Sequence, residues 1–341
     1  MKNRSLIAIL SFSLIIGLFT GCGSGYGVYA PTASAPLELQ IGVSTGENDP
    51  RNIAAHQFAD EVAEKTNGAI TAKIHPSGEL GGDAALIDEL AMNSSKINII
   101  ITDASNFATY EPKMGISALP FMFDDFESAW AFMDSDIEAQ AEELLIKNNI
   151  RVLAHYCNGF RCMTNSVKPI TSPADMEGML IRTPENPVIM ATMSSLNATP
   201  MPLSFSELYD ALEAGRYDGQ ENPIPVIYNN NLYEVQQYLS VTNHIYSGMC
   251  FAISDSLWNS LSLEQQKIIR EAAISSAEAD RQMNKAQSET LLSELEQKGM
   301  IINEPDLEPF KEATRSVITD NASIYGDLYD ELLAYLNKSS K

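Results

Sequence analysis

Basic side chains are scarce in this sequence. Its 341 residues contain 22 lysines and arginines against 45 aspartates and glutamates, which gives a net charge of -23. Nucleic acids and anionic lipid surfaces are therefore poor partners for the chain as a whole, and only a local cluster of basic residues could hold an anion. With 45% apolar and 20% charged residues the chain is nonetheless globular, and it is long enough for two domains with sizeable cores.

The sequence also lacks the common motifs of metal and hydrolytic sites. Histidine and cysteine occur four times each, with no H-E-x-x-H, no paired C-x-x-C and no G-x-S-x-G motif. The glycines of "SGELGGD" lack the lysine and the Ser/Thr of a phosphate-binding loop and indicate a turn into a helix. We therefore expect no catalytic residue, no metal and no cofactor, with structural roles for the histidines. Beyond Cys22, the three remaining cysteines allow at most one disulfide, and whether Cys157 pairs with Cys162 stays open.

Long apolar runs are absent after the N-terminus. Two basic residues, an apolar run over 6–19 and small residues before Cys22 predict an export signal over 1–21. The ending "LFTGC" resembles a bacterial lipobox and predicts lipidation of Cys22, although a plain secretory cleavage site is the alternative. The Gly/Ser/Ala/Pro-rich stretch 22–36 is typical of a flexible tether. We expect a protein outside the cytoplasmic membrane that is anchored by its N-terminal lipid.

Strands and helices alternate along the rest of the chain. "LELQIGVST", "ITAKIHP" and "INIIIT" have strand patterns, while "DPRNIAAHQFADEVAEKTNG" predicts a helix capped by Asp49 and ended by Gly68. This succession is typical of an α/β fold. Two capping boxes predict further helix starts, Ser204 with Glu207 and Ser262 with Gln265.

The second box opens a helical run that reaches Gly299. An unbroken helix of roughly 36 residues would span about 54 Å, more than one domain needs, so we expect it to brace two lobes. A coiled-coil partner helix is the alternative, but it requires an a/d heptad that this run lacks.

Two arginines stand out as anion-binding candidates. Arg161 in "NGFRCMT" and Arg182 in "LIRTP" each follow apolar residues at a predicted strand end, where open α/β sheets bind ligands. A guanidinium can hold a carboxylate through two parallel hydrogen bonds. The alternative for each arginine is a structural ion pair with one of the many acidic residues. Asn222, which precedes Pro223, could donate to a ligand oxygen or close an Asx turn.

Together these segments resemble the extracytoplasmic solute-binding proteins (DctP-type) of tripartite ATP-independent periplasmic (TRAP) transporters. The motifs that carry the resemblance are "HPSGELGGD", "ALPFMF", "NGFRCMTNSVKPI", "MEGMLIRTP", "FSELYDALEAGRYDGQENP" and "YEVQQYLSVTNH". The resemblance implies a two-lobed periplasmic-binding-protein fold, or Venus flytrap, with hinge strands and a long helix that spans both lobes. It implies lobe I from 37–158 and 248–287, the latter with half of the long helix. Lobe II would comprise 159–247 and 288–341, including the C-terminal helices.

The resemblance also implies a set of ligand-binding residues. Arg182 matches the arginine that forms a salt bridge with the ligand carboxylate, Arg161 the second arginine of the cleft, Asn222 an asparagine at the same end of the ligand, and Phe205 an aromatic beside it. In the sialic-acid binders of the family, further contacts fall at positions that are here Ser44, Asp83, Asp103, Asn106 and Asn186.

This chain departs from the sialic-acid binders in one stretch. Asn106 stands there where those binders have a further basic residue, and Asp103 stands where they have a glutamate. This argues against sialic acid and favours a smaller acid, either a hexuronate or another sugar acid, with a C4-dicarboxylate or a hydroxy or keto acid as the alternative.

The function implied is capture of an organic acid by a monomeric, non-enzymatic protein and its delivery to the membrane subunits of a TRAP transporter. Two other functions compete with it. A binding protein of this kind could instead present its ligand to a receptor kinase. An extracellular hydrolase or lyase would belong to another class and would need catalytic groups that the sequence does not offer.

Overall fold

A computed structural model describes residues 36–339 of the chain. The predicted export signal, Cys22 and the predicted tether up to residue 35 lie outside the described residues. Between residues 36 and 339, no helix is both long and apolar enough to cross a membrane.

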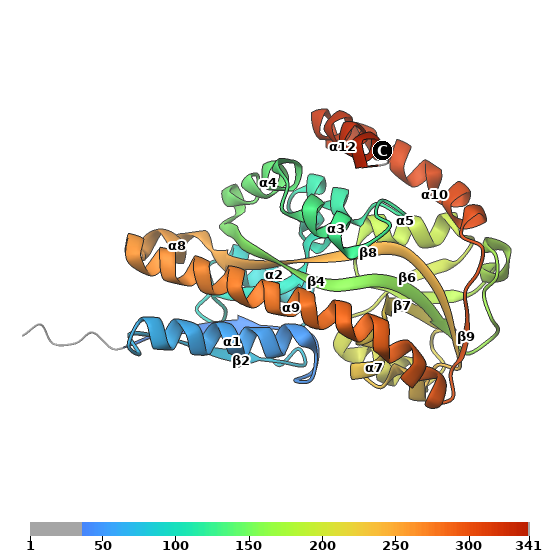
Figure 1. Cartoon of the computed structure of the whole chain (residues 1–341), viewed down its shortest axis with the longest axis horizontal. Helices are drawn as coiled ribbons and strands as arrows, with labels where there is room; N and C mark the ends of the chain where they lie inside the picture. The colour runs from blue at the N-terminus through green and yellow to red at the C-terminus, as the bar shows by residue number, and fades with distance from the viewer. Residues whose placement is uncertain (1–35, 340–341) are drawn as a thin grey trace, which may run out of the picture. The chain divides into compact units, whose positions relative to one another are not determined.

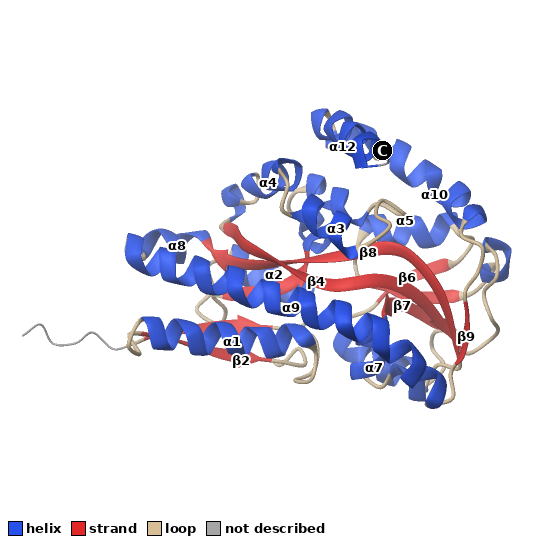
Figure 2. Ribbon diagram, in the orientation of Figure 1, coloured by secondary structure: helices blue, strands red, loops and turns tan. Residues whose placement is uncertain are grey.

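Within residues 36–339 the strands form one mixed sheet in the order β2-β1-β3-β8-β4-β7-β5-β6, with β9 beside β8 (Figures 1 and 2). The strands are β1 Leu37–Gly42, β2 Ile70–His75, β3 Ile99–Asp103, β4 Ile150–Asn165, β5 Leu180–Thr183, β6 Thr199–Pro202, β7 Gly219–Pro223, β8 Tyr238–Ser254 and β9 Ile301–Asn303. The alternation of strands and helices predicted from the sequence is confirmed, and the fold is α/β.

Helices cover both faces of this sheet (Figure 2). The α-helices are α1 Pro50–Lys65, α2 Asp83–Ala91, α3 Phe126–Met133, α4 Asp136–Glu143, α5 Pro187–Ser195, α6 Leu208–Glu213, α7 Ile224–Asn229, α8 Asp255–Ser260, α9 Leu263–Gln297, α10 Glu308–Asp320, α11 Ala322–Tyr325 and α12 Asp327–Ser339. The 3-10 turns are η1 Ala104–Thr109, η2 Pro112–Ala118, η3 Ile146–Asn148, η4 Pro173–Met176, η5 Phe205–Glu207 and η6 Leu232–Glu234.

The predicted ends of α1 are confirmed. The Asp49 side chain accepts a hydrogen bond from the backbone N–H of Arg51, and Pro50 occupies the first turn, where its missing N–H costs no helical bond. Gly68 follows the helix with a φ of 77°, a left-handed conformation that glycine adopts without a steric penalty. The helix buries Phe58 and Val62 against β1 and β3.

Two long strands connect the two ends of the sheet. β4 and β8 run antiparallel from the pair Ile150–Ser254 to the pair Asn165–Tyr238. β8 also pairs with β3, and β4 also pairs with β7. The register of β4 against β8 shifts at three places, so the pair contains β-bulges rather than a uniform ladder.

Helix α9 lies against one face of the sheet and contacts α1, β4 and α7 (Figure 1). Its predicted N-terminal box is confirmed: Ser262 Oγ accepts from Gln265 N at 3.2 Å, and Gln265 Oε1 accepts from Ser262 N at 2.9 Å. Ile269 in its first half packs in the apolar cluster with α1, whereas Leu295 near its end packs in a second cluster with α6 and α7. The helix therefore contacts both ends of the sheet, as the sequence predicts for a brace.

The other predicted capping box is wrong. Ser204 makes no capping hydrogen bond, and its hydroxyl instead lies 3.1 Å from that of Ser206. The chain enters α6 through the 3-10 turn η5. The predicted end of this segment is confirmed, because Gly215 has a φ of 65°.

The C-terminal helices α11 and α12 pack beside η2 and α4, where Tyr325 and Leu332 join the largest apolar cluster. Cys157, Cys162 and Cys250 are all buried free thiols, so no disulfide forms within residues 36–339.

Candidate ligand-binding site

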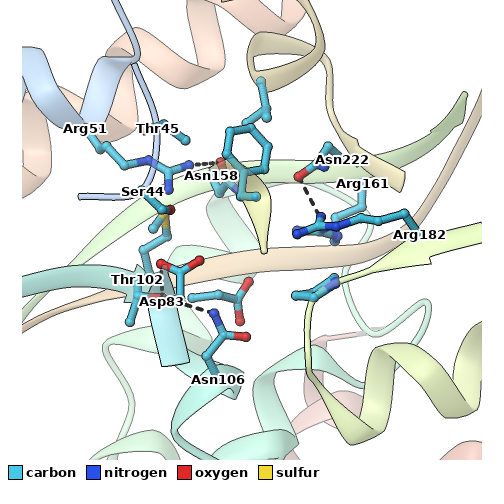
Figure 3. Close-up of a pocket in the computed structure, with 15 residues that line it drawn as sticks. Ser44, Thr45, Arg51, Asp83, Thr102, Asn106, Asn158, Arg161, Arg182 and Asn222 are labelled. Carbon is cyan, nitrogen blue, oxygen red and sulfur yellow. Dashed lines mark hydrogen bonds between the residues drawn. The ribbon is translucent and has the colours of Figure 1, made fainter. Parts of the chain in front are cut away.

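A polar pocket lies where β4, β5 and β7 approach the loops after β1 and β3 (Figure 3). Its empty space is about 420 Å³, including the part open to solvent. Its lining residues are Ser44, Thr45, Arg51, Asp83, Thr102, Asp103, Asn106, Asn158, Arg161, Arg182, Pro184, Phe205, Asn222, Val226 and Met249. Every site residue predicted from the sequence lines this pocket except Asn186.

Arg182 is a buried arginine without a carboxylate partner. It is the third of four residues in β5, with 3% of its surface exposed. Its Nε and Nη2 donate to the backbone carbonyl of Leu203 at 2.9 and 2.6 Å, and the guanidinium lies 5.8 Å from the ring centre of Phe205. Among the described residues no carboxylate is within ion-pair distance, and Nη1 has no protein acceptor. Burial lowers the pKa of Arg182 to about 10, which means that its positive charge is poorly compensated.

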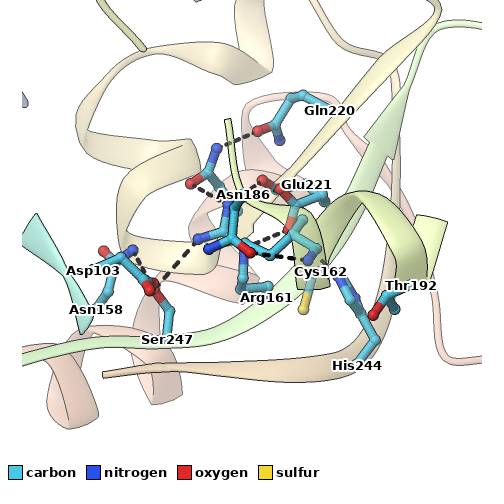
Figure 4. Close-up of polar contacts among 12 residues, drawn as sticks. Asp103, Asn158, Arg161, Cys162, Asn186, Thr192, Gln220, Glu221, His244 and Ser247 are labelled. Atoms are coloured by element: carbon cyan, nitrogen blue, oxygen red, sulfur yellow. Dashed lines mark hydrogen bonds and ion pairs between the residues drawn. The ribbon is translucent and has the colours of Figure 1, made fainter. Parts of the chain in front are cut away.

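Arg161 has the opposite environment. It lies inside the long strand β4, not at a strand end as predicted from the sequence. Its Nε pairs with Glu221, its Nη2 donates to the other oxygen of that carboxylate at 2.8 Å, and both residues are buried (Figure 4). Burial would raise the pKa of Glu221, but the Arg161 charge and the neighbouring His244 lower it to about 2. The structural ion pair, which was the alternative for this arginine, is therefore present, although Arg161 still lines the pocket.

Asn222 is held in place by side chains rather than by an Asx turn. Its Oδ1 accepts from Arg161 Nη2 at 3.2 Å, and its Nδ2 donates to Gln220 Oε1 at 2.5 Å. The two residues lie on the same face of β7, because residues two apart in a strand point the same way. The buried set of Arg161, Glu221 and Gln220 thus orients Asn222 beside Arg182 (Figure 3).

The opposite side of the pocket carries two carboxylates (Figure 3). Asp83, in the first turn of α2, accepts from Thr102 Oγ1 at 3.0 Å, and Asn106 Nδ2 donates to the same hydroxyl at 3.0 Å. Asp103, at the end of β3, accepts from the hydroxyls of Ser105 and Ser247. These aspartates have only hydroxyl and amide partners, and therefore keep oxygens that can accept from a ligand.

Asn186 supports the pocket from behind. Its Oδ1 accepts from Val188 N and Ile189 N at the start of α5, and its Nδ2 donates to Ser105 Oγ at 2.5 Å. A cap satisfies N–H groups that have no partner within the helix. Ser105 joins Asn186 to Asp103, because its hydroxyl also donates to that carboxylate (Figure 4). Asn186 Nδ2 also donates directly to Asn106 Oδ1 at 3.5 Å.

Sequence reasoning missed Arg51 and Asn158, whose side chains meet in the pocket. Arg51 Nη2 donates to Asn158 Oδ1 at 2.5 Å, and Arg51 Nε donates to Asp49 at 2.9 Å. The "DPR" start of α1 could have predicted the position of Arg51, because an acidic capping residue can hold a neighbouring arginine side chain close to the helix N-terminus.

Asn158 was harder to find, because it is three residues before Arg161. In a regular strand, residues three apart point to opposite faces. Both line the pocket because β4 has a register shift at Cys157/Gly159, which inserts Asn158 as an extra residue before Arg161. Gly159 has a φ of 114°, which ordinary side chains rarely adopt.

The charges divide the pocket into two sides. One side presents the uncompensated guanidinium of Arg182 with an amide and an aromatic ring beside it. The other presents Asp83 and Asp103 with their hydroxyl and amide partners. An anion fits the first side and hydroxyl donors fit the second.

Comparison with known proteins identifies the family of this chain. Residues 41–323 match the DctP family, described as bacterial extracellular solute-binding protein, family 7. The sialic acid-binding periplasmic protein SiaP of Vibrio cholerae is 32% identical over 325 residues, which cover 95% of this chain and 96% of SiaP. The 2,3-diketo-L-gulonate-binding periplasmic protein YiaO of Escherichia coli is 30% identical over 298 residues, covering 87% and 90%.

A solved structure is similar over the same region. A TRAP periplasmic solute-binding protein from Polaromonas, bound to D-erythronate, is 31% identical with a TM-score of 0.84, and the match covers 88% of this chain and 98% of that one. The two-lobed α/β fold predicted from the sequence is thereby confirmed. The chain belongs to the DctP family of bacterial extracellular solute-binding proteins, the solute-binding components of TRAP transporters.

Proposed function

We propose that this protein captures a polyhydroxy carboxylic acid outside the cytoplasmic membrane and delivers it, chemically unchanged, to a TRAP permease. The observation that carries this proposal is the division of the pocket between Arg182 and the aspartates Asp83 and Asp103. Arg182 is buried and lacks a carboxylate partner, so a ligand carboxylate would supply the missing negative charge.

The two aspartates favour a sugar acid over a C4-dicarboxylate. A second ligand carboxylate would lie against Asp83 and Asp103 and would be repelled, whereas hydroxyl groups can donate to them. The ligands named for the three similar proteins, sialic acid, 2,3-diketo-L-gulonate and D-erythronate, are all polyhydroxy carboxylates. A four-carbon to six-carbon sugar acid is the proposed class, because Asn106 does not supply the further positive charge expected for sialic acid.

Roles for the lining residues follow from their chemistry. Arg182 would fork the ligand carboxylate, Asn222 would donate to the same end, and Arg161 would hold Asn222 while Phe205 covers the carboxylate. On the other side, Ser44, Asp83, Asp103 and Asn106 would contact ligand hydroxyls. Asn186 would position Asn106 and Asp103 without contacting the ligand.

A thermal-shift screen tests the ligand class. Hexuronates, aldonates and D-erythronate should raise the melting temperature, while the matched neutral sugars and succinate should leave it unchanged. The acid that binds should be recovered intact after prolonged incubation with the protein. A shift with the neutral sugars, a stronger shift with succinate, or a converted acid would each contradict the proposal.

The N-terminus and the assembly complete the proposal. We propose that Cys22 is lipidated, that the protein acts as a monomer, and that the lobes have the boundaries predicted from the sequence. Replacing Cys22 by serine should release the protein from membranes without changing ligand affinity, because the described lining of the pocket begins at Ser44. A Cys22→Ser protein that stays on membranes would indicate an uncleaved signal anchor instead.

The alternative role in sensing has its own test. If cells that lack the TRAP permease still responded to the acid through this protein, the protein would act as a sensor component.

A further inference from the structure

A second polar cluster lies outside the ligand pocket, between α4 and the strands β4 and β8. His155 on β4 and Cys250 on β8 are direct cross-strand partners, so their side chains share one face of the sheet. Glu142 on α4 covers that face. His155 Nε2 lies 2.5 Å from Glu142 Oε1, and Cys250 Sγ lies 3.9 Å from the same oxygen.

These three side chains offer one nitrogen, one oxygen and one sulfur atom. All three atoms lie within 4.8 Å of one another. Ligands of a tetrahedral Zn²⁺ lie about 3.3–3.8 Å apart when the metal–ligand bonds are about 2.0–2.3 Å long. The short contact between His155 and Glu142 must open by about 1 Å to admit an ion.

The histidine is already oriented as a metal ligand would be. Its other ring nitrogen, Nδ1, lies 3.0 Å from Asp134 Oδ1, and Arg281 holds that carboxylate through two bonds of 2.7 and 2.8 Å. A metal-binding histidine almost always donates its second N–H to such a carboxylate, which fixes the tautomer and the ring plane. Nε2 is thereby directed at Glu142 and Cys250.

Glu138 is a further acidic side chain close to this cluster. It lies one turn before Glu142 on α4, is fully buried, and neither of its carboxylate oxygens has a hydrogen-bond partner. The charges of Glu142 and His155 act on it directly. A cation bound at Glu142 would make ionisation of this buried acid less costly.

We propose that Glu142, His155 and Cys250 form a Zn²⁺ site in which a water molecule is the fourth ligand. The mixed N, O and S donors fit zinc better than Mg²⁺ or Ca²⁺, which prefer oxygen atoms alone. Zn²⁺ takes the place of the proton on His155 Nε2 and displaces the proton of the Cys250 thiol, and both protons leave to solvent. The ion can enter from the His155 side, where 12% and 14% of the side chains of His155 and Glu142 are exposed.

Cobalt tests the site in the full chain, because a Co²⁺–thiolate bond gives a charge-transfer band in the near ultraviolet. After EDTA treatment and dialysis, Co²⁺ should produce this band and saturate it at one equivalent. Zn²⁺ should bleach the band and raise the melting temperature, while Mg²⁺ should do neither. If the parent chain gives no band and no melting shift with Zn²⁺, the proposal is wrong.

Two thiol variants locate the metal. Cys250→Ser should abolish the band, whereas Cys162→Ser should keep it, because the equally buried Cys162 thiol lies elsewhere, 3.2 Å from Asn243 Oδ1. A band that survives Cys250→Ser would place the metal at another site and overturn the proposal. If Cys250→Ser does not fold, Glu142→Gln decides instead. It keeps the side-chain shape but removes the charge of one ligand, so Zn²⁺ should bind at least about tenfold more weakly, and unchanged binding would overturn the proposal.

Discussion

Arg161 and Arg182 are both almost fully buried and line the same pocket, but their charges have different partners. Arg161 is neutralised by Glu221 within the protein, whereas Arg182 has only a backbone carbonyl and an aromatic ring. Removing one member of a buried ion pair leaves the other charge buried without a partner, which lowers the free energy of unfolding by about 3–5 kcal/mol. Removing an uncompensated charge leaves no such partner behind.

This contrast predicts different effects on folding without ligand. Arg161→Gln should lower the free energy of unfolding by about 3–5 kcal/mol, because Glu221 loses its partner. Arg182→Gln should change it by less than about 1 kcal/mol, since an amide can still donate to Leu203. Urea unfolding of both variants measures the difference. Equal losses would mean that Arg182 is structural as well.

Glu138 predicts a pH dependence of stability in metal-free protein. Burial and the nearby Glu142 raise its pKa from 4.5 to about 8. The folded state therefore holds a proton that the unfolded state releases in this interval, and stability falls as the pH rises from 4.5 to about 8. The charges of Glu142, His155 and Asp103 affect the pKa of Glu138. The charge of Glu138 in turn raises the pKa values of Cys250 and Tyr325.

The neutral variant Glu138→Gln isolates this effect. Compared with the parent in EDTA, this variant should become more stable through the same pH interval: its free energy of unfolding should exceed that of the parent by an amount that grows by more than about 1 kcal/mol towards the upper end. Urea titrations at several pH values provide the measurement. A constant difference between the two proteins would show that Glu138 does not titrate there.

Individual residues were predictable where a motif fixes both their type and their place. Arg182, Phe205 and Asn222 lie in such motifs and meet in the pocket. The partner of Arg161 was not predictable, because Glu221 is one of many acidic residues and the pair forms only when β7 lies beside β4. The cluster of Glu142, His155 and Cys250 has no motif spacing, so the sequence led us to expect no metal.

At the scale of elements, the sequence predicts regular structure better than its interruptions. The pattern S-x-x-E predicted a helix start at Ser204, but a 3-10 turn forms there and brings Phe205 over Arg182. The same kind of box at Ser262 does cap α9. The bulges of β4 leave no pattern in the sequence, yet they turn Asn158 and Arg161 toward one pocket.

A substitution at Gly159 tests whether ligand binding depends on that bulge. Its φ of 114° is strained for any other residue, and a Cβ there would lie 3.2 Å from Pro223 Cβ. Gly159→Ala should cost about 1–3 kcal/mol of stability and weaken ligand binding, because Asn158 and Arg161 would shift. Gly178→Ala is the control, since Gly178 also has a positive φ but has open space around it and lies outside the pocket. Equal ligand affinities in the two variants would contradict the role of the bulge.

At the scale of the whole molecule, the strands β4 and β8 and the helix α9 link the two ends of the sheet. The pocket takes residues from both ends, with Asp83 and Asp103 from one and Arg182 and Asn222 from the other. A ligand that bridges them stabilises the arrangement in which the two sides are close, and so shifts the population toward a closed form.

Small-angle scattering measures this shift in solution. The radius of gyration should decrease when the bound acid is added to the parent protein. The same concentration of the matched neutral sugar should have no effect. An unchanged radius with saturating acid would contradict closure around the ligand.

The proposed function depends most directly on a carboxylate meeting Arg182, and calorimetric titration tests that contact. The acid that gives the largest thermal shift is titrated into the parent, Arg182→Lys and Arg182→Ala. The alanine variant should bind about 3–5 kcal/mol more weakly, which is roughly two to three and a half decades in dissociation constant. The lysine variant should lie between the two, because it keeps the charge but loses the planar fork. If all three proteins bind the acid with the same affinity, Arg182 does not hold the carboxylate and the central claim is wrong.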